Sequence, residues 1–261
     1  MMRTRFFIFL FGAGLWCGSA FAQVCQTLVI SGPPQSPPSS WIMDQKLVGA
    51  SVEFVETVAL AAGVKTVEKR VFDTWSDALN ATRLGEVDLL FSTGFSTERA
   101  RFLTFLQPSY AGQFLYIVVR EGERFPLLKY EDLLGRRGAG GIGEAYGSGE
   151  FDKFVKNNLN LVRSPTISDS LALLFDKKVD YVLGYSNAVN SEIFTKNLLE
   201  KVDIVLTYPY YAETYIALSK RSKCTSLAAA LSTEIKKAEK NNLYYLLSKK
   251  YLAIFEQFSF K

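Results

Sequence analysis

Apolar residues follow two different spacings along this chain of 261 residues. Short apolar runs of strand length alternate with longer segments in which apolar residues recur every three or four positions, as in an amphipathic helix. In the first third, the pattern predicts strands at 27–30, 64–72 and 87–91 and helices at 52–62 and 75–84. The order β-α-β-α-β is typical of a doubly wound α/β sheet with right-handed crossovers.

The same order recurs in the next block of the chain. It predicts strands at 114–120, 161–163, 179–183 and 201–206, and helices at 150–158, 167–176 and 187–194. A further strand at 213–219 and two amphipathic helices, 226–240 and 243–255, close the chain. No sequence repeat is evident, but the repeated layout predicts two α/β lobes.

A glycine-rich stretch interrupts the second block at residues 135–143. Residues 138–143 fit the pattern G-x-G-x-x-G of dinucleotide-binding loops. That motif must follow a strand, whereas the residues before it are polar and typical of a turn. We therefore assign no strand to this stretch and expect no dinucleotide site.

The first 22 residues have the features of a signal peptide. Two arginines precede an apolar run at 6–16, which is too short to span a bilayer, and Ala20-Phe21-Ala22 is a suitable cleavage site. Cys17 would suit a lipoprotein only after a small residue, and Trp16 is not small. We expect cleavage near Ala22 and a periplasmic protein.

Charge and composition argue against several classes of function. Removal of residues 1–22 takes away two arginines and no acid, so the net charge falls from +4 to +2 and gives no basis for nucleic-acid binding. The chain has no histidine, hence no Ser-His or Cys-His pair and no histidine-ligated metal. We expect a protein that is not an enzyme and has neither cofactor nor metal.

Two cysteines, Cys25 and Cys224, remain after removal of the signal peptide. In an oxidising compartment such a pair is a candidate disulfide. Two buried free thiols are the alternative, and we favour the disulfide.

The stretch from residue 74 to 110 contains the candidate chemistry. A helix ends at Gly85, a short apolar strand follows, and a loop of small residues at 92–94 leads to Ser96-Thr97-Glu98-Arg99 at the start of a further helical segment. Backbone N–H groups, hydroxyls and one guanidinium would meet there. This combination favours a small anion, most simply a carboxylate.

The order and spacing of these residues resemble those of type II periplasmic solute-binding proteins, in particular family 3, which binds polar amino acids for ABC importers. The matching residues are Trp75, Leu84 to Asp88, Ser96 to Arg99 and Pro108 to Tyr110. The resemblance implies two doubly wound lobes joined by two hinge strands. The first would comprise 24–112 and 213–261, and the second 113–212. A small carboxylate ligand and an ABC permease are the partners it implies, and we expect a monomer.

The resemblance also implies roles for single residues of the first lobe. The arginine that matches Arg99 holds the α-carboxylate of the ligand, although an arginine here could instead pair with Glu98 at the surface. Ser92, Gly94 and Ser96 match the hydroxyl and backbone donors around that carboxylate. The two serines could instead be turn residues that cap the next helix.

Three aromatic residues match positions around the ligand. Trp75 corresponds to a ring against the ligand side chain, and Trp41 to an aromatic residue that covers the pocket. Core or rim positions are the alternatives for the two tryptophans. Tyr146 lies in a segment, 144–147, that matches a second-lobe loop at a helix N-terminus, where backbone N–H groups would meet the far side of the ligand.

Tyr185 is the main departure from the family pattern. Residues 179–185 match V-D-x-V-x-x-D, whose last aspartate neutralises the ammonium group of the ligand, and Tyr185 replaces that aspartate. A phenol cannot balance an ammonium charge. Either Glu213, Glu144 or Asp169 supplies the carboxylate, or the ligand lacks a free α-amino group.

Two other functions are compatible with the same fold. Some relatives, such as periplasmic cyclohexadienyl dehydratases, carry out acid–base chemistry with pocket carboxylates, for which Glu144 or Glu213 are the candidates. A ligand sensor that signals to a membrane receptor is the second alternative.

Overall fold

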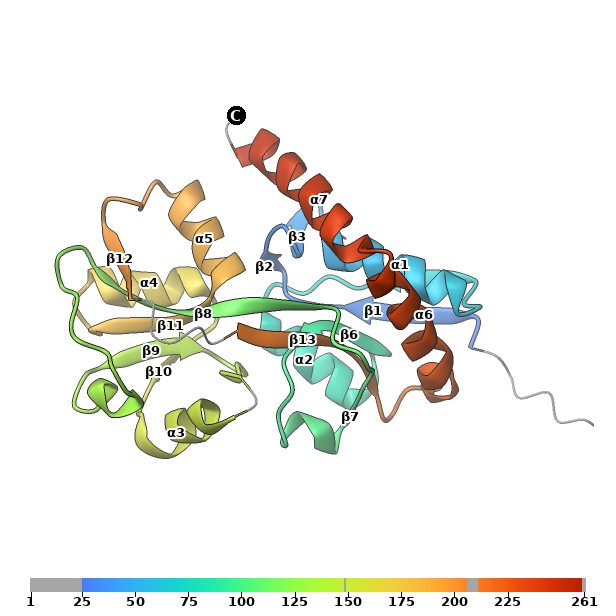
Figure 1. Cartoon of the computed structure of the whole chain (residues 1–261), viewed down its shortest axis with the longest axis horizontal. Coiled ribbons are helices and arrows are strands. Elements are labelled where there is room, and N and C mark those ends of the chain that lie inside the picture. The colour runs from blue at the N-terminus through green and yellow to red at the C-terminus, as the bar shows by residue number, and fades with distance from the viewer. Residues whose placement is uncertain (1–24, 148, 206–210, 260–261) are drawn as a thin grey trace, which may run out of the picture.

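The computed structural model of the chain describes residues 25–147, 149–205 and 211–259 (Figure 1). The predicted signal peptide and its cleavage site lie outside these residues. Within the described part of the chain, no helix combines the length and the apolarity that a membrane crossing needs.

The fold is mixed α/β with two lobes (Figure 1). Its strands and longer helices are, in chain order, β1 (Thr27–Ser31), β2 (Gln35–Ser36), β3 (Ser40–Met43), β4 (Lys46–Val48), α1 (Ala50–Ala61), β5 (Thr66–Lys69), α2 (Trp75–Leu84), β6 (Leu89–Thr93), β7 (Leu103–Phe105), β8 (Ala111–Arg120), β9 (Gly138–Gly141), α3 (Glu150–Asn158), β10 (Val162–Ser164), α4 (Ile167–Phe175), β11 (Tyr181–Tyr185), α5 (Ser186–Thr195), β12 (Val202–Val205), β13 (Tyr211–Ser219), α6 (Ala228–Lys240) and α7 (Leu243–Ser259). Three short 3₁₀ turns, η1 (Arg99–Arg101), η2 (Tyr130–Leu133) and η3 (Thr225–Leu227), complete the described elements.

Two long antiparallel strands, β8 and β13, join the lobes. Across the main sheet the strand order is β10-β9-β11-β8-β13-β6-β1-β5, with β12 on β8 and β7 on β13. The start of β8 pairs with β13, and its continuation pairs with β11. Gln113 lies opposite Ala212 in this pairing, where the chain crosses between the lobes.

Each lobe packs helices on both faces of its strands. In the first lobe, α1, α6 and α7 bury one face around Leu28, Ile30 and Phe91, and α2 covers the other face at Leu90 and Ala217. In the second lobe, α3 packs on the face that contains Ile117 and Leu183, whereas α4 and α5 pack on Val118 and Val182. Neighbouring strand residues therefore serve opposite cores, as the alternation of side chains along a strand requires.

Helix α2 shows how local sequence sets an element beside the site. The Thr74 hydroxyl accepts a hydrogen bond from the Asp77 N–H at 3.2 Å and so satisfies a free donor of the first turn. Gly85 ends the helix with φ of 85°, a left-handed conformation that costs glycine little. The predicted bounds of this helix, 75–84, agree with the structure.

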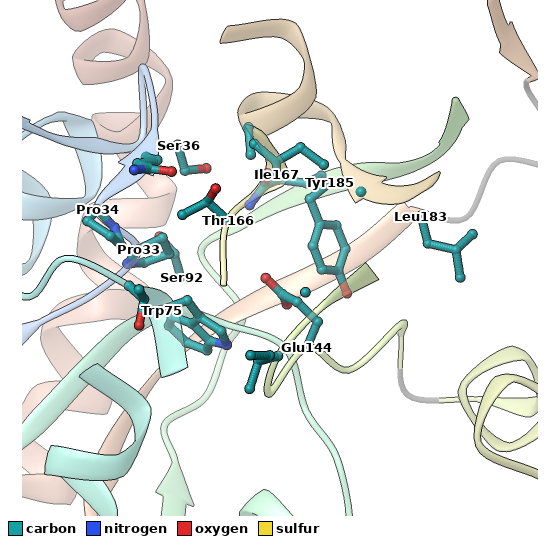
Figure 2. A pocket seen from close by; sticks show the side chains of 18 of the residues that line it. Pro33, Pro34, Ser36, Trp75, Ser92, Glu144, Thr166, Ile167, Leu183 and Tyr185 are labelled. Carbon is teal, nitrogen blue, oxygen red and sulfur yellow. The ribbon is translucent and has the colours of Figure 1, made fainter. Parts of the chain in front are cut away.

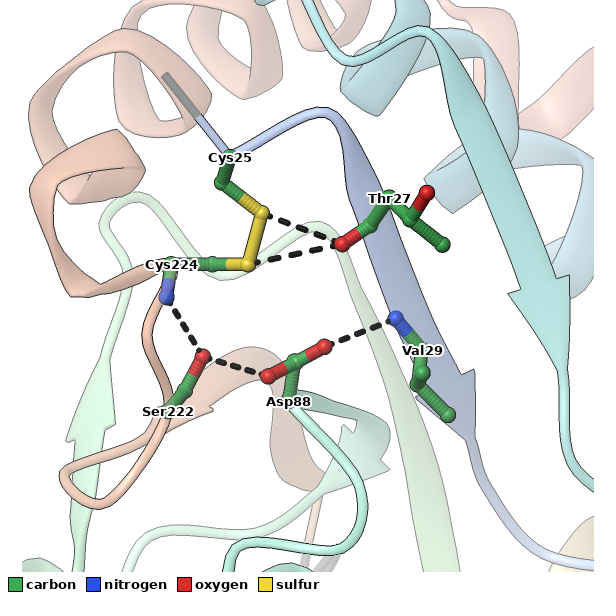
Figure 3. The surroundings of a disulfide bond; sticks show 6 residues. All are labelled: Cys25, Thr27, Val29, Asp88, Ser222 and Cys224. Atoms are coloured by element: carbon green, nitrogen blue, oxygen red, sulfur yellow. Dashed lines mark hydrogen bonds between the residues drawn. A yellow bond between two sulfur atoms is a disulfide. The ribbon is translucent and has the colours of Figure 1, made fainter. Parts of the chain in front are cut away.

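A disulfide joins Cys25 and Cys224, as the sequence led us to favour (Figure 3). It connects the residues before β1 with the residues before α6. Next to it, the Asp88 carboxylate accepts hydrogen bonds from the Val29 N–H and the Ser222 hydroxyl, at 2.9 and 2.6 Å. Asp88 thus stabilises the packing of the first strand against the C-terminal part of the chain.

Two local predictions were wrong. The helical segment expected after Ser96 is only the 3₁₀ turn η1, because the chain enters strand β7 immediately afterwards. The glycine stretch that received no strand contains β9, which pairs with both β10 and β11. Its glycines leave room for large side chains: a Cβ at Gly138 would overlap the Tyr181 ring, and one at Gly140 would overlap the Tyr146 hydroxyl.

Candidate functional site

A cavity of about 100 Å³ lies between the two lobes (Figure 2). It is formed by the segments that follow strands β1, β6, β9 and β10 and by the end of β11, together with the N-terminus of α2. In α/β sheets ligands bind at the carboxyl ends of strands, and here both lobes present those ends to one cavity. A single buried water needs about 10–15 Å³, so the cavity has room for a small organic molecule.

Arg99 is buried at the edge of this cavity and spans the gap between lobes. Its Nη1 donates to the Thr93 hydroxyl at 3.2 Å and to the Gly94 carbonyl at 2.8 Å. Its Nη2 donates to the carbonyl of Gly143, in the second lobe, at 2.8 Å. The guanidinium also lies over the Trp75 ring, 5.2 Å from the centroid. Among the described residues, the Nε–H and one Nη2 hydrogen have no acceptor.

Ser96 and Ser92 hold the backbone around this arginine. The Ser96 hydroxyl accepts the Arg99 N–H at 3.1 Å, so this serine caps the turn η1, and it faces a neighbouring cavity rather than the central one. Ser92 lines the central cavity, but its hydroxyl belongs to a buried cluster with Ser39, Ser51 and Tyr110 at 2.9–3.0 Å. Its φ of 52° is a left-handed conformation within β6, one residue before the strand ends.

The remaining residues predicted in the first lobe differ in position. Gly94 and Trp75 line the cavity, and Trp75 also packs in the core against Leu90. Trp41 is not among the lining residues. It lies in β3, and its ring makes edge contacts with Tyr251 and Phe255 of α7.

Tyr146 and Tyr185 line the cavity from the second lobe. The Tyr185 hydroxyl donates to the Ala145 carbonyl and accepts the Gly147 N–H, the latter at 3.3 Å, so it fixes the loop that contains residues 144–147. Burial raises the pKa of both phenols above the usual range, and the nearby Glu144 carboxylate adds to the effect. Both side chains are therefore neutral.

Glu144 is half-buried, and in Figure 2 its carboxylate points toward the middle of the cavity. Its stem lies over Gly141, where a Cβ would come within 2.6 Å of the Glu144 Cγ. Burial raises the pKa of this carboxyl, and the Arg99 and Arg163 guanidinium groups partly oppose the rise. Asp73, at the exposed rim, also lines the cavity.

Gln113 and Thr166 are two of the lining residues that were not predicted from the sequence. Gln113 lies in β8 where the lobes meet, is 9% exposed, and has a side-chain oxygen without a hydrogen-bond partner among the described groups. A glutamine in an otherwise apolar strand was the available signal. Thr166, which caps α4, faces the first lobe across the cavity (Figure 2). The sequence around Thr166 indicates only a helix cap, so its position at the cavity could not be predicted.

Comparisons with known proteins agree with this architecture. The family model of bacterial extracellular solute-binding proteins, family 3, matches residues 28–254. A histidine kinase sensor domain with similarity to periplasmic binding proteins has a similar structure, with a TM-score of 0.71 and 26% identity over 87% of this chain and 96% of that one. An ancestral arginine-binding protein bound to arginine is also similar, with a TM-score of 0.70 and 21% identity over 87% of this chain and 98% of that one.

An amino acid ABC transporter substrate-binding protein from Streptococcus pneumoniae, bound to L-arginine, gives a TM-score of 0.69 and 19% identity over 88% and 96% of the two chains. No curated protein sequence matches this chain significantly.

Proposed function

This chain belongs to the bacterial extracellular solute-binding proteins of family 3, and from that premise we propose that it captures a small amino-acid-like carboxylate between its lobes and delivers it to an ABC importer. The family and the similar transporter structures are binding proteins rather than enzymes, and family members act outside the cytoplasm. In this proposal the two lobes close around the ligand, and the closed protein delivers the ligand to the permease.

The observation that supports the proposal most strongly is the position of the Arg99 guanidinium. It is anchored in the first lobe by Thr93 and Gly94 and reaches the Gly143 carbonyl of the second. Two of its N–H donors remain for a ligand carboxylate, which a guanidinium can bind with two parallel hydrogen bonds. A ligand held there contacts both lobes only when they are together, so its binding energy favours closure.

Replacement of Arg99 tests the proposal. We expect Arg99→Lys, which keeps the charge but loses the planar fork, to weaken binding by roughly ten- to hundredfold, because charge-assisted hydrogen bonds are worth about 1.5–3 kcal/mol each. A thermal-shift screen over the twenty amino acids and simple organic acids identifies a ligand, and calorimetry measures it. The control is Arg101→Lys on the exposed side of the same turn, which should bind like the wild type. Full affinity in Arg99→Lys would refute the role of Arg99.

A sensing function is the second candidate, supported by the likeness to the histidine kinase sensor domain. Here the closed form would signal to a membrane receptor instead of supplying a transporter. Deletion of the gene separates the two: loss of uptake of the identified ligand supports transport. Normal uptake with a lost transcriptional response to that ligand supports sensing.

A further inference from the structure

The hydroxyl of Tyr185 is already committed to the protein. It donates to Ala145 and accepts from Gly147, which lie about forty residues earlier in the chain. A neutral phenol in these two bonds has no charge to offer an ammonium group. The residue at this position therefore positions the loop 144–147 instead of contacting a cation directly.

Two of the three candidate carboxylates are occupied elsewhere. The Glu213 oxygens accept hydrogen bonds from Ser109 and Tyr215, at 3.1 and 2.6 Å, and this residue lines a separate cavity. The Asp169 carboxylate accepts the N–H and hydroxyl of Thr166 in the capping box of α4, and it does not line the central cavity. Neither is available to a ligand in that cavity.

Glu144 differs from both. Among the described residues its carboxylate has no hydrogen bond and no ion pair, although it lies within the electrostatic reach of Arg99 and Arg163. It is half-buried, and Figure 2 shows it directed into the cavity. A half-buried carboxylate without a partner is costly to keep ionised, and a cationic ligand would remove that cost.

Three further residues that line the cavity carry a buried polar atom without a hydrogen-bond partner among the described groups, and one of these atoms, the Tyr146 hydroxyl, lies against Gly140 of β9. The Gln113 Oε1 is an acceptor, and the Trp75 Nε1 is a donor beside the guanidinium of Arg99. The residues that line the cavity therefore carry unpaired donors, on Arg99 and Trp75, and unpaired acceptors, on Glu144 and Gln113, among the described groups. A zwitterion satisfies both kinds of group, whereas a simple carboxylic acid leaves the acceptors unpaired.

We propose that Glu144 receives the ammonium group of the ligand, and that the ligand is an α-amino acid whose carboxylate is held by Arg99. This assignment rests on the proposed binding function and specifies its ligand class. Tyr185 contributes by holding the loop that presents Glu144. The family pattern places the carboxylate that binds the ammonium group at the end of β11. In this assignment that carboxylate lies in the loop after β9, and it determines the selectivity for an amino group.

The test compares amino acids with their 2-hydroxy acids, in which a hydroxyl replaces the ammonium group. The probes are the twenty standard L-amino acids and the matching hydroxy acids, measured by calorimetry on the purified protein. Glu144→Gln keeps the shape and removes the charge. The matched control, Glu213→Gln, removes one negative charge from a carboxylate that lies outside this cavity and is already hydrogen-bonded to Ser109 and Tyr215.

We expect the wild type to prefer its best amino acid over the matching hydroxy acid by at least about tenfold, equivalent to about 1.4 kcal/mol. Glu144→Gln should abolish this preference by weakening amino-acid binding, while hydroxy-acid affinity stays within about twofold and Glu213→Gln keeps the preference. A wild type that binds both compounds equally would overturn the assignment, as would a preference that survives in Glu144→Gln. Unchanged affinity for both compounds in Arg99→Lys would instead overturn the proposed carboxylate site. Failure of every amino acid and every hydroxy acid to bind the wild type would overturn both.

Discussion

At the scale of single residues, Tyr185 and Glu144 have separate roles: the Tyr185 hydroxyl holds the loop 144–147 through Ala145 and Gly147, and the Glu144 carboxylate points into the cavity. The pattern around Val179 and Asp180 identified Tyr185 as the departure from the family, and the consequence for an ammonium group followed from the chemistry of a phenol. The partners of the hydroxyl, Ala145 and Gly147, could not be predicted, because they approach Tyr185 only after β9 and β11 pair. For the same reason, the sequence could not decide which of three carboxylates faces the ammonium group of a ligand.

The raised pKa of Glu144 predicts a pH dependence of binding. Burial holds its proton more tightly than usual, whereas an ammonium ligand requires the ionised form. Affinity for the amino acid should therefore fall as pH decreases through the raised pKa, with proton release on binding in that range. The charged groups that face Glu144 are Arg99 and Arg163, and the phenols of Tyr146 and Tyr185, whose pKa values are raised by burial, stay neutral in that range.

Calorimetry in buffers of different ionisation enthalpy measures this proton release, and Glu144→Gln should show none.

The raised pKa of Glu144 also predicts how the free energy of unfolding changes with pH when no ligand is bound. The folded state binds more protons than the unfolded chain between the ordinary and the raised pKa, so this carboxyl lowers the free energy of unfolding as pH rises through that window. Urea unfolding of Glu144→Gln should lack this decrease. An equal decrease in the free energy of unfolding of the variant would contradict the raised pKa of Glu144.

At the scale of elements, β9 shows why a strand can be absent from the pattern and present in the fold. Glycine disfavours strands, so residues 138–141 gave no strand signal. In the structure these glycines accommodate Tyr181, Tyr146 and the stem of Glu144, which lie against the strand. The strand depends on side chains that belong to other elements. Helices such as α2, with a cap at Thr74 and a stop at Gly85, depend on their own residues and were predicted accurately.

This packing predicts a specific effect of Gly140→Ala. The new Cβ would overlap the Tyr146 hydroxyl, and Tyr146 is almost fully buried, so it cannot move aside freely. We expect a loss of roughly 1–3 kcal/mol in the free energy of unfolding, measured by urea denaturation, together with weaker amino-acid binding. Adding Tyr146→Phe removes the overlapping oxygen and should restore part of the stability. Strictly additive losses in the double variant would argue against this contact.

At the scale of the whole molecule, the two lobes could be predicted because the order of strands and helices repeats and the helices have regular apolar faces. The hinge strands followed from the resemblance, and the pairing of β8 with β13 and β11 agrees with them. The meeting of Arg99 with Gly143 could not be predicted, because it depends on how the lobes close. The packing of Trp41 on α7 depends in the same way on an element at the far end of the chain.

The disulfide should stabilise the molecule without affecting the cavity. Cys25 and Cys224 are 199 residues apart in sequence, and replacing both by serine should lower the free energy of unfolding by roughly 3–5 kcal/mol, since a long loop is released in the unfolded chain. Urea denaturation of the double variant measures this loss. Amino-acid affinity by calorimetry should be unchanged below the transition, because the bridge lies before β1 and α6, away from the lining residues. A selective loss of affinity in a folded variant would contradict this separation.

The path of the chain through the first lobe also has a consequence for biogenesis. Strand β6 pairs with β13, and Cys25 with Cys224, so an early segment of the chain must wait for one of the last to be synthesised. The segment from β9 to β12 is contiguous and needs no such delay. The lobe that contains the first strand of the described chain is thus completed last, and until then the edges of its strands are unpaired and open to wrong pairing.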